Sequence, residues 1–136
     1  MLTSEKFAAH AGICSGLAFL SSDQVVSAGD DQKLIVRDIQ TGQVQSEFTL
    51  GDNTYPIDLD VIGDRHKKSQ TVALGASDGK VSLFSVQSGQ VRFEKKWTAH
   101  HGACIRCVTS PSGAELLTCG EDGLCKVQFL LMKKQF

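Results

Sequence analysis

Four cysteines near the end of the chain are candidate metal ligands. The set comprises Cys104, Cys107, Cys119 and Cys125, with His100 and His101 close by in the sequence. Thiolate and imidazole groups are the usual ligands of structural zinc, so these residues form a possible zinc set. The spacing argues against it, because Cys104 and Cys107 fall in a predicted strand, where residues three apart face opposite sides. Buried or half-buried thiols are the simpler interpretation.

Catalytic motifs are only partly matched. Residues 75–80, Gly-Ala-Ser-Asp-Gly-Lys, have three residues between the glycines and a valine after the lysine, whereas a phosphate-binding loop has four and then Ser or Thr. We therefore interpret the segment as a hairpin turn. Neither a nucleophile elbow nor a carboxylate pair stands out. The sequence thus predicts no catalytic residue, no cofactor and no enzyme.

The chain is instead organised by a repeat. An apolar strand, a turn with an aspartate and a second apolar strand recur around Asp31, Asp78 and Asp122, which are 47 and 44 residues apart. His10 and His100 are 90 residues apart, or two periods. A period of roughly 40 to 45 residues with four short strands per unit is typical of WD-type propeller blades. The predicted fold is therefore all-β, with about three WD40-type blades.

Turn residues set the expected blade boundaries. A short lead precedes blade 1 at about 10–50, blade 2 at about 51–98 and blade 3 at about 99–129, and an off-pattern tail covers 128–136. Propellers have about 4 to 8 blades, so three cannot close a ring. We expect an incomplete ring, a fragment of a larger propeller, whose uncovered end strands favour association.

Polar residues at recurring places predict a buried hydrogen-bond network. In such blades a loop histidine, a strand hydroxyl and the turn aspartate satisfy one another. The predicted members are His10, Ser27, Asp31, Asp78, His100, Thr118 and Asp122. Leu74 replaces the hydroxyl in blade 2, so we expect apolar packing to hold that blade. The tryptophan of such repeats is replaced by Arg37, Phe84 and Gln128.

A polar insertion in blade 2 is a possible contact for an acidic partner. Its basic or titratable members are Arg65, His66, Lys67 and Lys68. A merely solvated loop is the alternative, since adjacent charges on a loop cost little.

Composition excludes several classes of protein. With 136 residues and a net charge of −1, the chain has no electrostatic attraction to nucleic acid or anionic membranes. No apolar run is long enough to span a membrane, and the first residues lack a signal-peptide pattern. The odd number of cysteines, 5, predicts reduced thiols in the cytosol.

One stretch is more particular than a general WD repeat. Residues 52–59, Asp-Asn-Thr-Tyr-Pro-Ile-Asp-Leu, resemble the entry to the second blade in the family of the eighty-kilodalton WD-repeat subunit of intraflagellar transport complex B. Residues 77–80, 99–103 and 120–123 are similar to its next segments, in the same order. The similarity runs from about His10 to Val127.

This resemblance implies a non-enzymatic scaffold in cilium assembly and ciliary transport, located in the cytoplasm, at the ciliary base and in the cilium. It implies protein partners, namely other complex B subunits, and no nucleic acid, membrane insertion or small-molecule substrate. Two alternatives stay open. One is a WD-repeat adaptor of another complex, from which only Tyr55-Pro-Ile-Asp58 discriminates. The other is a small zinc or thiol protein.

Overall fold

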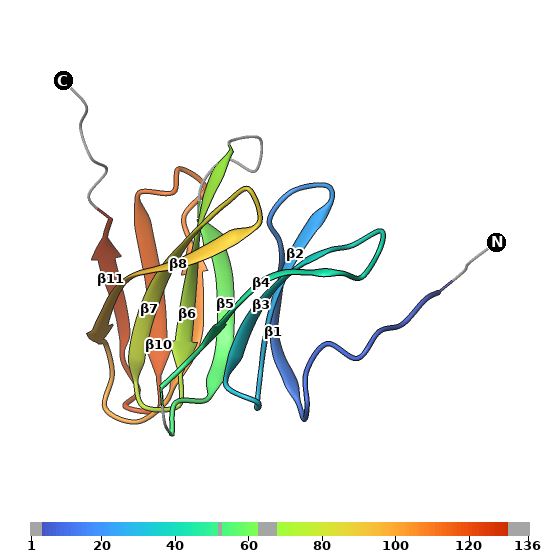
Figure 1. The fold of residues 1–136 in the computed structure, drawn as a ribbon. Helices are drawn as coiled ribbons and strands as arrows, with labels where there is room; N and C mark the ends of the chain where they lie inside the picture. The colour runs from blue at the N-terminus through green and yellow to red at the C-terminus, as the bar shows by residue number, and fades with distance from the viewer. Residues whose placement is uncertain (1–3, 52, 63–67, 131–136) are drawn as a thin grey trace.

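Three antiparallel sheets make up the protein. The computed structural model describes residues 4–51, 53–62 and 68–130. These residues form eleven β-strands and no helix, and consecutive strands are neighbours within each sheet (Figure 1). The described part of the chain therefore has no helix long and apolar enough to cross a membrane.

The strands follow the repeat. Sheet 1 contains β1 (Cys14–Phe19), β2 (Gln24–Gly29), β3 (Lys33–Asp38) and β4 (Val44–Thr49). Sheet 2 contains β5 (Pro56–Ile62), β6 (Ser69–Ala76), β7 (Lys80–Gln87) and β8 (Gln90–Thr98). Sheet 3 contains β9 (Cys104–Thr109), β10 (Glu115–Gly120) and β11 (Cys125–Phe129). Sheets 1 and 3 lie on opposite sides of sheet 2, so the described residues form an open arc (Figure 1).

The turn after the second strand of each sheet needs a left-handed residue. The residue after each turn aspartate has positive φ, which is 64° at Gln32, 81° at Gly79 and 79° at Gly123. Glycine adopts this region freely, whereas a residue with a side chain pays about 1 kcal/mol or more. Gln32 offsets part of this cost, because its Nε2 donates to the carbonyls of Gly51 and Thr54 at 3.1 and 3.3 Å.

A one-residue bulge recurs in the first strand of each sheet. The extra residues are Ser15, Ile57 and Ile105. A bulge interrupts the alternation of side chains, so residues three apart across it face the same side. Cys104 and Cys107 therefore both face sheet 2 and are buried there. Cys104 and Cys107 therefore do not face opposite sides, contrary to what strand alternation without the bulge predicted.

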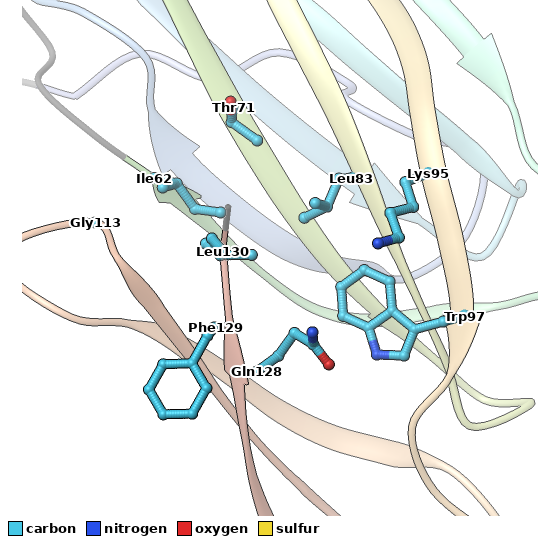
Figure 2. A pocket seen from close by; sticks show the side chains of 9 residues that line it. All are labelled: Ile62, Thr71, Leu83, Lys95, Trp97, Gly113, Gln128, Phe129 and Leu130. Atoms are coloured by element: carbon cyan, nitrogen blue, oxygen red, sulfur yellow. The ribbon is translucent and has the colours of Figure 1, made fainter. Parts of the chain in front are cut away.

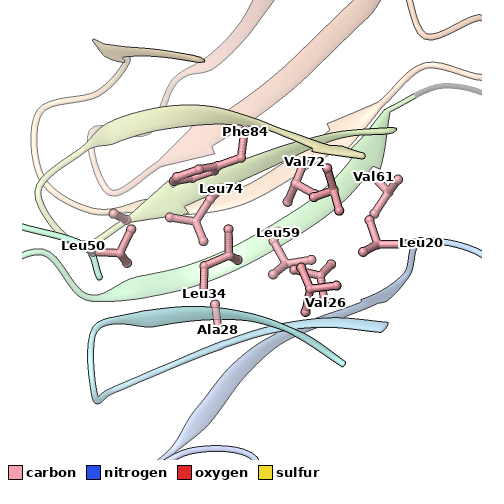
Figure 3. Packing of buried hydrophobic residues seen from close by; sticks show 13 residues of the cluster. Leu20, Val26, Ala28, Leu34, Leu50, Leu59, Val61, Val72, Leu74 and Phe84 are labelled. Atoms are coloured by element: carbon pink, nitrogen blue, oxygen red, sulfur yellow. The ribbon is translucent and has the colours of Figure 1, made fainter. Parts of the chain in front are cut away.

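Aliphatic side chains fill the space between sheets 1 and 2 (Figure 3). Leu34 and Val36 of β3 face Leu74 of β6, and all three are fully buried. Phe84 of β7 is also fully buried, with its ring centroid 5.1 Å from that of Phe48 in β4. Removal of this apolar surface from water is the main driving force for joining the two sheets.

The junction of sheets 2 and 3 is smaller and partly polar. Its buried apolar members are Ile62, Ala73, Val81, Ala99, Cys104, Cys107 and Leu116. Two carboxylates of β5 bind the backbone of β9. Asp58 accepts the Cys107 amide at 3.0 Å, and Asp60 accepts the Thr109 amide at 2.8 Å.

The aromatic cluster provides a test of this packing. We expect Phe84→Ala to lower the free energy of unfolding by about 3–5 kcal/mol, because it opens a cavity between sheets 1 and 2. Phe93→Ala is the matched control, since Phe93 contacts the same rings but is 43% exposed. Urea denaturation followed by circular dichroism measures both. Equal losses in the two variants would contradict the assignment of Phe84 to the core.

Candidate functional site

A buried histidine links loop, strand and turn in sheet 1. His10 Nδ1 lies 2.8 Å from Asp31 Oδ1, and His10 Nε2 lies 2.8 Å from Ser27 Oγ. An ionised carboxylate only accepts, so Nδ1 donates to Asp31, and in the neutral ring Nε2 then accepts the hydroxyl of Ser27. Asp31 also accepts the amide of Ala11 at 3.2 Å. Both ring nitrogens are thus occupied, and His10 joins the loop to the strand and the turn.

Sheet 3 repeats this arrangement. His100 Nδ1 lies 3.0 Å from Asp122 Oδ1, and Nε2 lies 2.8 Å from Thr118 Oγ1. Asp122 also accepts the amides of His101 and Leu124, each at 3.1 Å. The His100 side chain is fully buried. The structure therefore brings together all the polar residues predicted for this blade.

Sheet 2 uses a shorter connection. Thr54 Oγ1 donates to Asp78 Oδ2 at 3.2 Å, in place of an imidazole. Leu74, at the position of the strand hydroxyl, is fully buried. Sequence analysis missed Thr54, although it precedes its aspartate by 24 residues, close to the spacing of 21 and 22 for the two histidines. Counting back 21 or 22 residues from Asp78 gives Ile57 and Pro56, so the spacing alone would not have identified Thr54.

Glycine makes room for each histidine ring. A Cβ added to Gly29 would lie 2.6 Å from His10 Cγ, and one added to Gly120 would lie 2.5 Å from His100 Cγ. Both distances are shorter than real Cβ contacts. Ala76 occupies the equivalent position in sheet 2, which has no such ring. The residue two places before the turn aspartate is therefore glycine in the two sheets that contain the histidine and alanine in the sheet that lacks it.

These contacts change the acidity of two aspartates. Burial alone would raise the pKa of Asp31, but hydrogen bonds from His10 and the Ala11 amide outweigh it, so the pKa lies below its ordinary value. The pKa of Asp122 is lowered in the same way, against burial, by the Leu124 amide and by His100. Both carboxylates are therefore ionised at neutral pH.

The three residues at the tryptophan position behave differently. Phe84 fills the core, and Gln128 is exposed at the edge of sheet 3. Arg37 is buried, with its Nη2 donating to the Ala9 carbonyl at 3.1 Å and its guanidinium 5.2 Å from the Phe7 ring centroid. Its Nη1 is buried without a hydrogen-bond partner among the described residues.

The four candidate zinc ligands lie on two faces of sheet 3. Cys104 and Cys107 face sheet 2, where burial raises the pKa of Cys104 to about 11 and raises that of Cys107 as well. Cys119 and Cys125 are cross-strand partners. By strand alternation with buried Thr118, they lie on the other face. Among residues 4–51, 53–62 and 68–130, no three or more His, Cys, Asp or Glu side chains are grouped to hold a metal ion.

Of the predicted basic contact, only Lys68 is described, and it is exposed. Arg65, His66 and Lys67 lie outside the described residues.

A hollow of about 370 Å³ opens between sheets 2 and 3 (Figure 2). Leu83, Lys95 and Trp97 line one side, and Gln128 and Leu130 line the other. It combines an indole ring, aliphatic groups and one ammonium group, which suits an extended peptide better than a small polar substrate. This hollow is the candidate interaction site of the described chain.

Comparison with known proteins agrees with this architecture. The family model described as WD domain, G-beta repeat matches residues 92–127. The chain is similar to a chain in the crystal structure of the mitotic checkpoint complex, with a TM-score of 0.72 and 20% identity, over 88% of this chain and 38% of that one. The predicted fold of WD40-type propeller blades in an open ring is confirmed.

Curated relatives include two intraflagellar transport proteins. The chain is 28% identical over 123 residues to the intraflagellar transport protein 80 homologs of Rattus norvegicus and Mus musculus, covering 87% of this chain. The predicted resemblance to that family is confirmed. The chain spans 15% of the length of these relatives. It is also 43% identical over 51 residues to WD repeat-containing protein 1-B of Xenopus laevis, covering 38% of this chain and 8% of that protein.

Alanine at the glycine positions tests the confinement of the rings. We expect Gly120→Ala to destabilise the protein by about 1–3 kcal/mol, because the methyl group pushes His100 away from Thr118 and Asp122 and leaves buried polar atoms unpaired. Gly51→Ala is the matched control, because a Cβ added there meets nothing within 4 Å, and it should leave the stability unchanged or raise it by up to about 1 kcal/mol. Denaturation midpoints report both. A Gly120→Ala variant that costs no more than the control would argue against a confined ring.

The acidity of Asp31 predicts a pH dependence. Because its folded-state pKa lies below its unfolded value, ionised Asp31 adds stability above its ordinary pKa of about 4. This contribution is lost as the pH falls through the folded-state pKa. Asp31→Asn should therefore be less stable at neutral pH and lose less stability on acidification. Asp30→Asn, an exposed neighbour in the same turn, should follow the unmodified protein in thermal melts. Parallel curves for all three would contradict this account.

Proposed function

We propose that this chain is a non-catalytic interaction module of intraflagellar transport, acting as a scaffold of complex B in cilium assembly. The observation that carries the proposal is the similarity to intraflagellar transport protein 80 homologs over 87% of the chain. The expected location is the cytoplasm, the ciliary base and the cilium. The proposed partners are proteins, in particular other complex B subunits, and no metal or cofactor is needed.

The geometry supports binding rather than turnover. The most conspicuous polar residues, the two histidines and their aspartates, are committed to hydrogen bonds with one another. What remains exposed are loops and sheet edges on a rigid frame, which is where proteins place binding residues. We divide the chain into blade 1 at about 10–50, blade 2 at about 51–98 and blade 3 at about 99–129, with an off-pattern tail after it.

The basic insertion of Arg65, His66, Lys67 and Lys68 is proposed as the partner contact, since its charges would meet an acidic segment of a partner. Of these four residues, only Lys68 lies among the described residues.

A WD-repeat adaptor of another complex is the second candidate. It is favoured by the 43% identity over 51 residues to WD repeat-containing protein 1-B. The Tyr55-Pro-Ile-Asp58 stretch favours the first candidate, and Tyr55 is 44% exposed at the rim, where a partner can read it.

Affinity purification from ciliated cells tests the proposal. The tagged chain should co-purify with intraflagellar transport proteins and should be enriched in cilia. Replacement of Arg65, Lys67 and Lys68 by serine should reduce the recovered partners several-fold if the insertion is a contact. Lys33→Ser/Arg92→Ser, on β3 and β8 and outside the lining of the hollow, is the control for loss of charge alone. Recovery of an unrelated complex, with no ciliary enrichment, would favour the adaptor.

A further inference from the structure

The outer face of sheet 3 is exposed, whereas the equivalent face of sheet 1 is buried against sheet 2. Val26 and Val36 lie five residues before and after Asp31, face sheet 2 and are fully buried. Leu117 and Val127 lie five residues before and after Asp122, and they are 46% and 53% exposed. Since equivalent positions of a repeat have equivalent surroundings, the outer face of sheet 3 is built to contact another blade.

The outer face of sheet 1 shows the complementary pattern. Leu59 of β5 packs against sheet 1 and is 6% exposed, whereas Leu17, at the same register position in β1, is 69% exposed. Phe19 is likewise half exposed. At both junctions within the arc, the face equivalent to that of Val26 packs against the face equivalent to that of Leu59. The two ends of the arc are thus the two halves of one blade junction.

Residues 4–10 carry the sequence of an outer strand. Ser-Glu-Lys-Phe-Ala-Ala-His at 4–10 aligns with Glu-Lys-Lys-Trp-Thr-Ala-His at 94–100, the end of β8 and the loop that follows. Phe7 therefore corresponds to Trp97. Residues 4–9 nevertheless belong to no sheet in the described chain, while β11 is an edge strand and sheets 1 and 2 each have a fourth strand.

Phe7 already occupies the place of an outer-strand aromatic residue. Its ring lies 5.2 Å from the guanidinium of Arg37 in β3. Phe48 of β4 lies 5.1 Å from Phe84, which is the equivalent of Arg37 in sheet 2. The segment therefore sits against sheet 1 as β4 sits against sheet 2.

The hollow beside β11 is where a fourth strand of sheet 3 would lie, next to the three that the structure describes. It runs between Trp97 and Lys95 of β8 and Gln128 of β11 (Figure 2). In the preceding junction, β8 covers β4 and Phe93 stacks on Phe48 with centroids 6.0 Å apart. An extended strand on β11 would cover β8 in the same way.

We propose that two copies of this chain associate head to tail, with residues 4–8 of each copy completing sheet 3 of the other. Residues 4–9 and β11 lie at opposite ends of one molecule, so they cannot meet within it (Figure 1). Two arcs of three sheets make six blades, within the range of about 4 to 8 for closed propellers. The two junctions are related by a two-fold axis, so both close together. The proposal rests on the fold and is independent of the role in transport.

The register of the new strand pair follows from sheet 2. Val81 pairs with Trp97 there. Val81 corresponds to Cys125 and Trp97 to Phe7, so Phe7 of one copy should face Cys125 of the other. Cross-strand partners are about 4.5–5.5 Å apart between Cα atoms, a separation that a disulfide can bridge.

Light scattering after size exclusion measures the association. We expect a mass of twice the 14.7 kDa of the chain. Leu117→Glu and Val127→Glu should return it to the mass of one chain with unchanged circular dichroism, because both side chains are exposed in a single copy and buried in the ring. Tyr55→Glu is the control, since Tyr55 is 44% exposed in the loop before β5 of the central sheet, and it should leave the mass doubled.

Cross-linking tests the strand pairing separately. On mild oxidation, Phe7→Cys should yield a covalent species of twice the chain mass on a non-reducing gel, and Phe7→Cys/Cys125→Ser should not. A single-chain mass at every attainable concentration would overturn the proposal, as would a series of larger open-ended assemblies. A dimer that does not cross-link from position 7 to Cys125 would overturn the pairing of residues 4–8 with β11. None of these outcomes bears on co-purification with transport proteins.

Discussion

Each sheet in this protein has two apolar faces, and the described chain has no helix to cover either of them. The rest of the structure depends on that constraint. Sheet 2 shows the satisfied case, because Leu74 of β6 is buried against sheet 1 while its neighbour Ala73 is buried against sheet 3. A strand that is buried on both sides has few polar residues, as β6 does from Val72 to Ala76. Each sheet is therefore stabilised by packing against its neighbours, and a single sheet would not be stable alone.

The histidine networks set the register of this stacking. His10 and His100 each join a loop to the middle of a blade, and their buried nitrogens are satisfied by a hydroxyl and a carboxylate. A buried polar group without a partner costs more than a partnered one gains, so the loop has one favourable position. Such loops form the rim of the arc. The network thus supports function indirectly, by fixing the surface that partners would contact.

The strands and the polar networks could be predicted because both follow short-range rules. Alternation and turn glycines locate the strands, and a period near 45 residues relates His10 to His100. The bulge at Ile105 could not be predicted, since nothing in the local sequence distinguishes it from a regular strand residue, and the error reversed the orientation of Cys104. Thr54 was missed because a hydroxyl replaced the expected imidazole. Residues 1–9 were expected to be only a lead, because an outer strand is recognisable there only by alignment with 94–100.

The two junctions of the arc differ in strength, so an additional strand stabilises some parts of the protein more than others. Sheets 1 and 2 share a continuous aliphatic cluster with three aromatic rings in mutual contact. Sheets 2 and 3 share fewer apolar groups and rely on Asp58 and Asp60 to bind the backbone of β9. Every residue of β11 is exposed. Few buried contacts and an open edge mark the segment that opens first in a native protein. Whatever strand binds beside β11 therefore stabilises the weakest part of the chain, so binding there is coupled to the folding of sheet 3.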